Sequence, residues 1–253
     1  MGRVSGAAQL EAVGWMSPPY AKAFFPVTTV PSPQDIASQI DARLRSLPLE
    51  NTPSVRAVRQ AFSRTLRNAD GHFVFQVASV LRSIYGYRTV PYELIQAHKG
   101  AFQLLGKREL EELGKGLDSW FSVDSFARTL SGPAWRDGLI GDDLVEKWAR
   151  SRDRWWRRAA LVSTVALNVR SLGGKGDVSR TLKVCRLLVD DHEDMVEKAL
   201  SWALRELVVH DASAVTRFIA SYENRLGAPV RREVGSKLRT GLKAPRRSRK
   251  QGG

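Results

Sequence analysis

The sequence predicts an all-α protein, built as a right-handed α-solenoid with a concave basic groove, and three observations lead to this fold class. Apolar residues recur at helical spacing in one segment after another, and no segment makes a convincing strand. The connections are mostly about 2 to 8 residues long, as between stacked helices. Stretches that mix Trp, Arg and carboxylates recur 34 and 44 positions apart, which brackets the period of about 40–47 residues of HEAT-like repeats. A closed helical bundle is the alternative.

Residues 1–33 are predicted to form an irregular N-terminal extension, because glycines and five prolines interrupt them. A first helix should run from Asp35 to Leu47 with Ser32 or Asp35 as its cap. The second should start at Thr52-Pro53, with proline at the first helical position. Residues 72–87 are β-branched enough for a strand, but their length and apolar spacing favour a buried helix.

The same reasoning continues to residue 242, which makes 34–242 one helical-repeat domain and leaves 243–253 as a basic disordered tail. A helix is expected at Glu193–Leu207, because acids occupy its first turn and no Gly or Pro interrupts its apolar stripe. The other expected helices are Pro91–Leu105, Lys107–Leu117, Trp120–Leu130, Asp142–Ala149, Arg154–Val169, Val178–Asp190, Ala212–Tyr222 and Pro229–Leu242.

The charge balance favours a polyanionic partner, nucleic acid first of all. The chain has 40 basic and 26 acidic side chains, a net charge of +14 and a pI near 10.4. The tail holds five of the positive charges and no acid, so the remainder keeps a surplus of nine. A single cysteine, Cys185, can form no internal disulfide, and no metal-ligand spacing is present. With no apolar run of membrane length and no signal peptide, we expect a cytoplasmic, nucleoid-associated protein without metal or cofactor.

Three stretches combine aromatic side chains with charge. Trp120 and Asp124 are four residues apart and share a helical face; Asp124 either forms an ion pair with a neighbouring Arg or takes part in chemistry. Trp202 and Arg205 lie near one edge of an apolar face and either close the core or line a groove. The third stretch, Trp148–Arg158, clusters cations that need solvent or an anion, and phosphates would satisfy them. Its candidate DNA-binding residues are Arg154, Trp155, Arg157 and Arg158.

The order and spacing of these stretches resemble those of the AlkD-type DNA glycosylases, a family of HEAT-like-repeat DNA alkylation repair enzymes. The similar positions are Trp120 and Asp124, then Trp148, Trp155 and Arg158, then Lys198-Ala199, Trp202, Leu204, Arg205 and Glu206. Phe121 stands where relatives often have a polar residue, and the glycine usual before Thr52-Pro53 is missing.

The resemblance implies a monofunctional glycosylase that removes cationic alkylpurines such as 3-methyladenine and 7-methylguanine from double-stranded DNA without flipping the base. It implies that Asp124 is the catalytic carboxylate, that Trp120 and Trp202 flank the deoxyribose of the lesion, and that Arg158 holds a backbone phosphate. Bulky adducts would also fit a site without an enclosing pocket. The expected partner is alkylated duplex DNA, bound by a monomer.

Two other readings remain open at this point. Related HEAT-like modules can hold damaged or branched DNA without cutting a glycosidic bond, although a pure DNA binder has no need of a carboxylate among phosphates. An α-solenoid can also serve as a scaffold for protein partners, against which the net charge of +14 argues.

Overall fold

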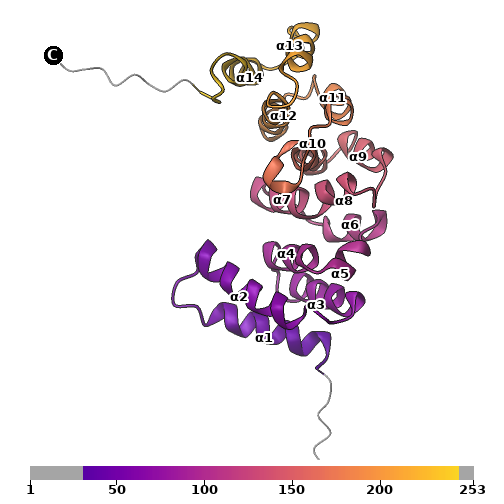
Figure 1. Cartoon of the computed structure of the whole chain (residues 1–253), viewed down its shortest axis with the longest axis vertical. Coiled ribbons are helices and arrows are strands. Elements are labelled where there is room, and N and C mark those ends of the chain that lie inside the picture. The colour runs from indigo at the N-terminus through magenta and orange to yellow at the C-terminus, as the bar shows by residue number, and fades with distance from the viewer. Residues whose placement is uncertain (1–30, 245–253) are drawn as a thin grey trace, which may run out of the picture. The chain divides into compact units, whose positions relative to one another are not determined.

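The computed structural model describes residues 31–244, and the regular structure in this part of the chain is helical, with no strand. The helices are stacked in chain order from α1 to α14 (Figure 1). The predicted all-α class and the stack of helical repeats are confirmed. The predicted N-terminal extension and C-terminal tail lie outside the described residues, except for Pro31 to Pro33, Lys243 and Ala244.

The first three helices begin at side-chain caps. The capping box of Ser32 and Asp35 starts α1 (Pro33–Arg45), so Pro33, predicted to belong to the extension, is the first residue of this helix. Asn51 caps α2 (Thr52–Thr65), which moves Pro53 one position further into the helix than predicted. Asp70 caps α3 (Gly71–Ser83), and the buried helix predicted there is confirmed.

The prediction of a single helix over Pro91–Leu105 is wrong. The structure has two helices, α4 (Thr89–Ala97) and α5 (Lys99–Gln103), separated by His98 in an extended conformation with φ −110° and ψ 108°. The side chain of His98 explains the break, because its Nδ1 accepts a hydrogen bond from the backbone N–H of Ala101 at 3.0 Å and caps the second helix.

Later helices agree with the prediction to within a few residues, although several end earlier. They are α6 (Lys107–Leu113), α9 (Asp142–Ala149), α10 (Arg154–Asn168), α11 (Val178–Leu187), α12 (Asp194–Leu207), α13 (Ala212–Ser221) and α14 (Ala228–Thr240). A short 3₁₀ turn, Arg170–Leu172, follows α10.

The helix predicted over Trp120–Leu130 is longer than expected and contains a π-helical turn. It consists of α7 (Trp120–Phe126), a π-helical segment Ala127–Ser131 and α8 (Gly132–Arg136). Pro133 lacks an N–H and would clash with the carbonyl of the preceding turn of a regular α-helix. A π turn just before it relieves this conflict, so the chain continues as a helix past a residue that usually ends one.

From α7 onward the helices form two layers. Figure 1 shows α7, α10, α12 and α14 following one another along one side of the stack, with α9, α11 and α13 along the other. Neighbours in the first layer pack directly, α7 on α10, α10 on α12 and α12 on α14. Each helix therefore contacts mainly helices close to it in sequence, as in a solenoid, and the closed bundle is ruled out for the described residues.

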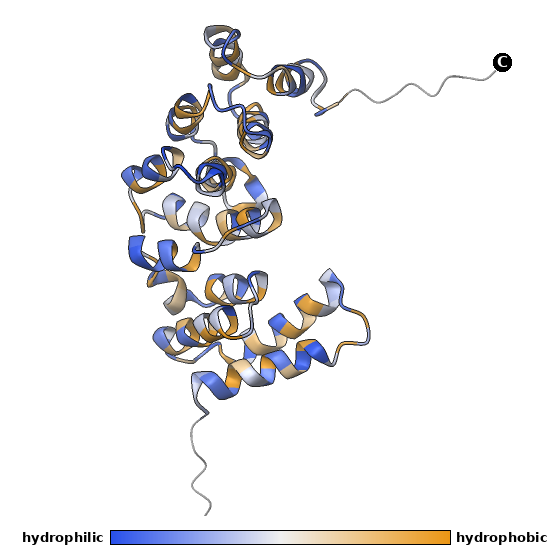
Figure 2. Cartoon of the chain, turned by 180° about the vertical axis from the view of Figure 1, so that it is seen from behind, coloured by the Kyte–Doolittle hydropathy of each residue, from blue (hydrophilic) through white to orange (hydrophobic). Residues whose placement is uncertain are grey.

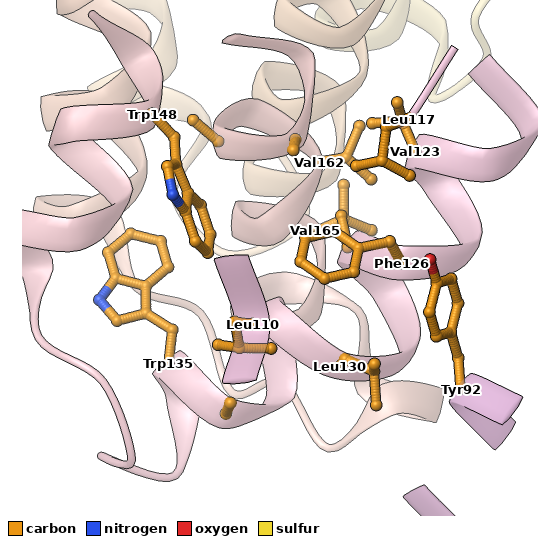
Figure 3. Packing of buried hydrophobic residues seen from close by; sticks show 14 of the residues in the cluster. Tyr92, Leu110, Leu117, Val123, Phe126, Leu130, Trp135, Trp148, Val162 and Val165 are labelled. Carbon is orange, nitrogen blue, oxygen red and sulfur yellow. The ribbon is translucent and has the colours of Figure 1, made fainter. Parts of the chain in front are cut away.

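Helix α10 lies at the centre of this packing. Its residues from Arg158 to Asn168 are all buried, and it contacts α7, α8, α9, α11 and α12. Figure 3 shows Val162 and Val165 from this helix among the buried side chains of its neighbours. Peripheral helices are amphipathic instead, as the alternating orange and blue bands of α1 and α2 show in Figure 2. Because α10 is buried from Arg158 onward, the charged side chain of Arg158 is buried with it.

Gly132 allows the π-containing helix to approach α10. A Cβ at this position would lie 2.7 Å from the Ala166 Cβ and 2.7 Å from the Ser163 carbonyl oxygen.

We expect Gly132→Ala to lower the free energy of unfolding by about 1–3 kcal/mol through overpacking, measured by urea denaturation. Gly235→Ala in α14 is the control, because its Cβ would meet only the end of the flexible Arg239 side chain, at 3.1 Å; it should be neutral or stabilising by up to about 1 kcal/mol. Equal losses in both variants would contradict the close approach.

Candidate functional site

The N-terminal end of α7 presents an exposed aromatic side chain beside a carboxylate. Ser119 caps the helix in a capping box with Ser122, which fixes where it begins. Trp120, the first helical residue, is 55% exposed, whereas the side chain of Asp124 one turn later is only 15% exposed. On the helical face that Trp120 and Asp124 were predicted to share, the aromatic ring is therefore exposed to solvent and the carboxylate is recessed, that is, mostly buried.

Asp124 is held by a bidentate ion pair with Arg158 of α10. The Nε of Arg158 donates to Oδ1 of Asp124, and its Nη2 donates to Oδ2, each at 2.9 Å. The Nη1 of Arg158 donates at 2.6 Å to the backbone carbonyl of Met195 in α12, and the Arg158 side chain is 6% exposed. Three helices thus fix the carboxylate, and each of its oxygens keeps a lone pair for a further contact.

Burial raises the pKa of Asp124 above its ordinary value of 3.8, against the opposing effects of the hydrogen bonds from Arg158 and the positive charges of Arg158 and Arg128. A bidentate guanidinium stabilises the ionised form of a carboxylate. At neutral pH, Asp124 is therefore an anion in a largely desolvated position, where its field on a nearby cation is stronger than in water.

Arg158, for which the family resemblance implies a backbone-phosphate contact, is engaged within the protein in this DNA-free structure. All three of its nitrogens already donate to Asp124 or Met195, and the guanidinium is almost fully buried. Nη1 and Nη2 each keep one further N–H, but the side chain is only 6% exposed, so little of the guanidinium is accessible to a phosphate. The ion pair of Asp124 with a neighbouring arginine, considered from the sequence, is the arrangement that the structure has.

The other predicted cations on α10 are also paired. Arg157 donates to Asp191 at 2.6 Å and to the carbonyls of Ser151 and Arg152 at 3.1 and 2.9 Å. Arg154 is 51% exposed, lies 3.4 Å from a Glu193 carboxylate oxygen and stacks over the ring of Trp155 with its Cζ 4.8 Å from the ring centroid. Of the three arginines, Arg154 offers the most accessible surface to a ligand, because Arg157 is 20% and Arg158 6% exposed.

On α12, Trp202 and Arg205 are half-buried and fixed by hydrogen bonds. The indole Nε1 of Trp202 donates to Glu206 at 2.8 Å, which sets the orientation of the ring. The Nε of Arg205 donates to Ser201 at 3.2 Å and lies 3.8 Å from a carboxylate oxygen of Glu233. Trp202 therefore has a fixed ring face, and Arg205 is tied to the helix α14 that carries Glu233.

The three aromatic stretches look from the sequence like the lining of one groove, but the structure places Trp148 of the second stretch in the core. Trp148 is 2% exposed and belongs to the core, with its ring 5.0 Å from that of Trp156 and 6.2 Å from that of Phe126. Figure 3 shows Trp148 and Phe126 among the buried side chains. These aromatic residues stabilise the packing of α7, α9 and α10.

Sequence reasoning missed Arg128, which follows Asp124 by four residues in the π-helical segment. Its side chain is exposed, and its Cζ lies 5.7 Å from the centroid of the Trp202 ring. Arg128 thereby connects the carboxylate on α7 with the aromatic residue on α12. The spacing Trp120, Asp124, Arg128 could have indicated a shared face, but it gives no sign of the contact with Trp202.

A cavity of about 620 Å³ lies beside the N-terminal end of α7. Four parts of the chain line it: Leu44 of α1, residues at the start of α2 such as Thr52, Val55 and Arg56, Tyr87 to Val90 around the start of α4, and Ser119, Phe121 and Ser122 at the start of α7. Neither Asp124 nor any tryptophan lines it. This cavity is therefore separate from the carboxylate.

Two further observations concern the described part of the chain. No helix between residues 31 and 244 combines the length and the apolar composition of a membrane span. Within the same residues, no three His, Cys, Asp or Glu side chains form a group that could hold a metal ion.

A family model described as "DNA alkylation repair enzyme" matches residues 51–238, which include the three aromatic stretches and every residue of the site above. No curated protein matches the chain.

Proposed function

Because the chain belongs to the DNA alkylation repair enzyme family, we propose that it is a monofunctional DNA glycosylase for cationic alkylpurines in duplex DNA. The substrates are 3-methyladenine, 7-methylguanine and bulkier adducts of the same charge. The enzyme hydrolyses the N-glycosidic bond and does so without flipping the base into a pocket.

The observation that carries this proposal is the recessed carboxylate of Asp124, fixed by Arg158 next to the exposed Trp120. A protein that only holds the DNA backbone gains nothing from an anion at its contact surface, since the anion repels phosphates. An enzyme that stabilises a positively charged sugar needs a negative group held in place before the reaction. The buried guanidinium of Arg158 keeps Asp124 ionised and oriented, so we assign Arg158 as a positioning residue.

The chemistry needs few groups, because an alkylated purine cation is already a good leaving group. The bond between C1′ and the base nitrogen breaks, and its electron pair leaves with the base, which becomes neutral without a general acid. Positive charge then develops on the sugar as an oxocarbenium-like species. Water adds at C1′ and loses a proton, which the free lone pairs of Asp124 can accept.

Two indole faces can add to the stabilisation of the sugar cation. Trp120 is exposed beside Asp124, and the Trp202 ring is fixed by Glu206 with Arg128 over it. An aromatic face attracts a cation electrostatically. The position held by the Arg128 guanidinium is a place where a positive group already interacts with Trp202.

The proposal is tested by single-turnover release of 7-methylguanine and 3-methyladenine from methylated duplex DNA. Release by the wild type, well above the spontaneous rate, would support it. Tight binding to methylated DNA without release of either base would favour the non-catalytic module for damaged or branched DNA. A duplex with a bulky cationic adduct tests the open site, because an enclosed site would release only the methylated bases.

The pH dependence of release gives a further prediction. Catalysis needs the ionised form of Asp124, so the rate should be constant near neutral pH and fall about tenfold per pH unit below the pKa of this group. Because burial raises that pKa above 3.8, the fall should begin at a higher pH than for an ordinary aspartate. Base release measured from pH 4 to 8 would show this acid limb. The residual activity of Asp124→Asn should lack it, and a limb of equal size in the variant would contradict the assignment.

A further inference from the structure

The cations that the sequence indicated for DNA binding are largely occupied within the protein. Arg154, Arg157 and Arg158 each pair with a carboxylate, and Arg205 is hydrogen-bonded to Ser201 near the carboxylate of Glu233. A guanidinium that already has such partners gains less from a phosphate, since it must give up the old contact first. The site therefore needs another cation if it is to bind the DNA backbone beside the lesion.

Arg128 is such a cation. It is exposed, and among residues 31–244 it has no ion pair and no side-chain hydrogen bond. Its contact is the stacking of its guanidinium over Trp202. Its charge also acts on Asp124, whose pKa it lowers against the effect of burial. The Arg128 guanidinium thus lies between Asp124 and Trp202, and its N–H groups have no hydrogen-bond acceptor in the described part of the chain.

The π-helical turn contributes to this placement. Arg128 is the second residue of the segment Ala127–Ser131, in which the helix is wider than an α-helix. The backbone on both sides is fixed, because Asp124 is paired with α10 on one side and Gly132 packs against α10 on the other. The guanidinium consequently reaches α12 from a rigid base.

We propose that Arg128 binds the backbone phosphate next to the lesion's deoxyribose, and that in the DNA-free protein it covers the Trp202 face that the sugar contacts in the complex. An exposed stacking contact between a cation and an aromatic ring is weaker than bidentate, charge-assisted hydrogen bonds to a phosphate. A phosphate next to the lesion therefore draws Arg128 off the ring and uncovers Trp202 when DNA is present. The sugar contact rests on the proposed function; the phosphate contact does not.

The test is binding to an undamaged duplex, measured by fluorescence anisotropy over a range of salt concentrations. Arg128→Gln should lower the magnitude of the slope of log K against log salt by about 0.9, the loss of one phosphate contact. The affinity at low salt should fall by about tenfold. Arg225→Gln is the matched control, because Arg225 also stacks on an aromatic ring, that of Tyr222, but pairs with Asp190; it should leave the slope unchanged. An unchanged slope for Arg128→Gln, or equal changes in both variants, would overturn the phosphate contact.

The covering of Trp202 has its own readout. Arg128→Gln should change the tryptophan fluorescence of the DNA-free protein, and the same substitution in a Trp202→Phe background should not. An identical difference in both backgrounds would overturn this part of the proposal. Binding to undamaged DNA requires no base release, so a protein with the expected slope but no glycosylase activity would contradict only the proposed function. An active enzyme with an unchanged slope would contradict only the role of Arg128.

Discussion

Asp124→Asn is expected to lower the single-turnover rate of 7-methylguanine release by about 10²–10³-fold, the usual effect of removing one preorganised electrostatic group. The amide has nearly the same shape as the carboxylate, and its oxygen can still accept a hydrogen bond from Arg158. What it lacks is the negative charge that stabilises the sugar cation. DNA affinity should stay the same or rise slightly, because the substitution removes an anion near phosphates.

Asp143→Asn provides the matched control for this measurement. Asp143 is an exposed carboxylate in the first turn of α9, and no ion pair involves it among the described residues. Its variant should release base at the wild-type rate. Circular dichroism at the assay temperature establishes that Asp124→Asn is folded. A folded Asp124→Asn protein with wild-type activity would remove Asp124 from the mechanism.

Arg158→Ala is expected to reduce the free energy of unfolding by about 3–5 kcal/mol, because it leaves the carboxylate of Asp124 buried without a partner. The Met195 carbonyl would also lose its donor. For a protein of this size, the melting temperature should fall by about 2–4 °C per kcal/mol. Thermal and urea unfolding would measure the loss. Activity should fall as well, since the carboxylate would no longer be held in position.

Two comparisons separate this effect from a general loss of charge. Arg154→Ala removes an exposed cation and should cost less than about 1 kcal/mol. The double variant Asp124→Asn/Arg158→Met removes both charges and should be more stable than Arg158→Ala alone. The salt dependence of DNA binding should not change in Arg158→Ala; a slope reduced by about one phosphate would instead support the backbone contact implied by the family resemblance.

Most helices could be predicted from the sequence because apolar spacing and caps are local signals. Two departures depended on the three-dimensional structure. The break at His98 arises because an imidazole nitrogen acts as a helix cap, which propensity does not indicate. The helix that continues through Pro133 depends on a π turn and on the fit of Gly132 against α10. A proline preceded by a glycine ordinarily predicts the end of a helix.

For the site, residue identities were easier to predict than their contacts. The sequence indicated Trp120, Asp124, Arg158 and Trp202, and the structure places Asp124 and Arg158 in direct contact. The sequence could not show that Arg158 is buried, because its burial follows from the central position of α10 in the stack. The sequence could not show the contact of Arg128 with Trp202 either, because this contact joins two helices that are far apart in the chain.

The hydrogen bond from Arg158 to the Met195 carbonyl attaches the site to α12. The site therefore depends on which helices of the stack unfold first. In an array where each repeat contacts only its neighbours, the ends can unfold locally while the middle stays intact. Opening of α13 and α14 would leave the Asp124 pair in place, whereas opening of α12 would break its third anchor. Amide hydrogen exchange should therefore be slow together in α7, α10 and α12, and variants that speed exchange in α12 should lose catalysis before they melt.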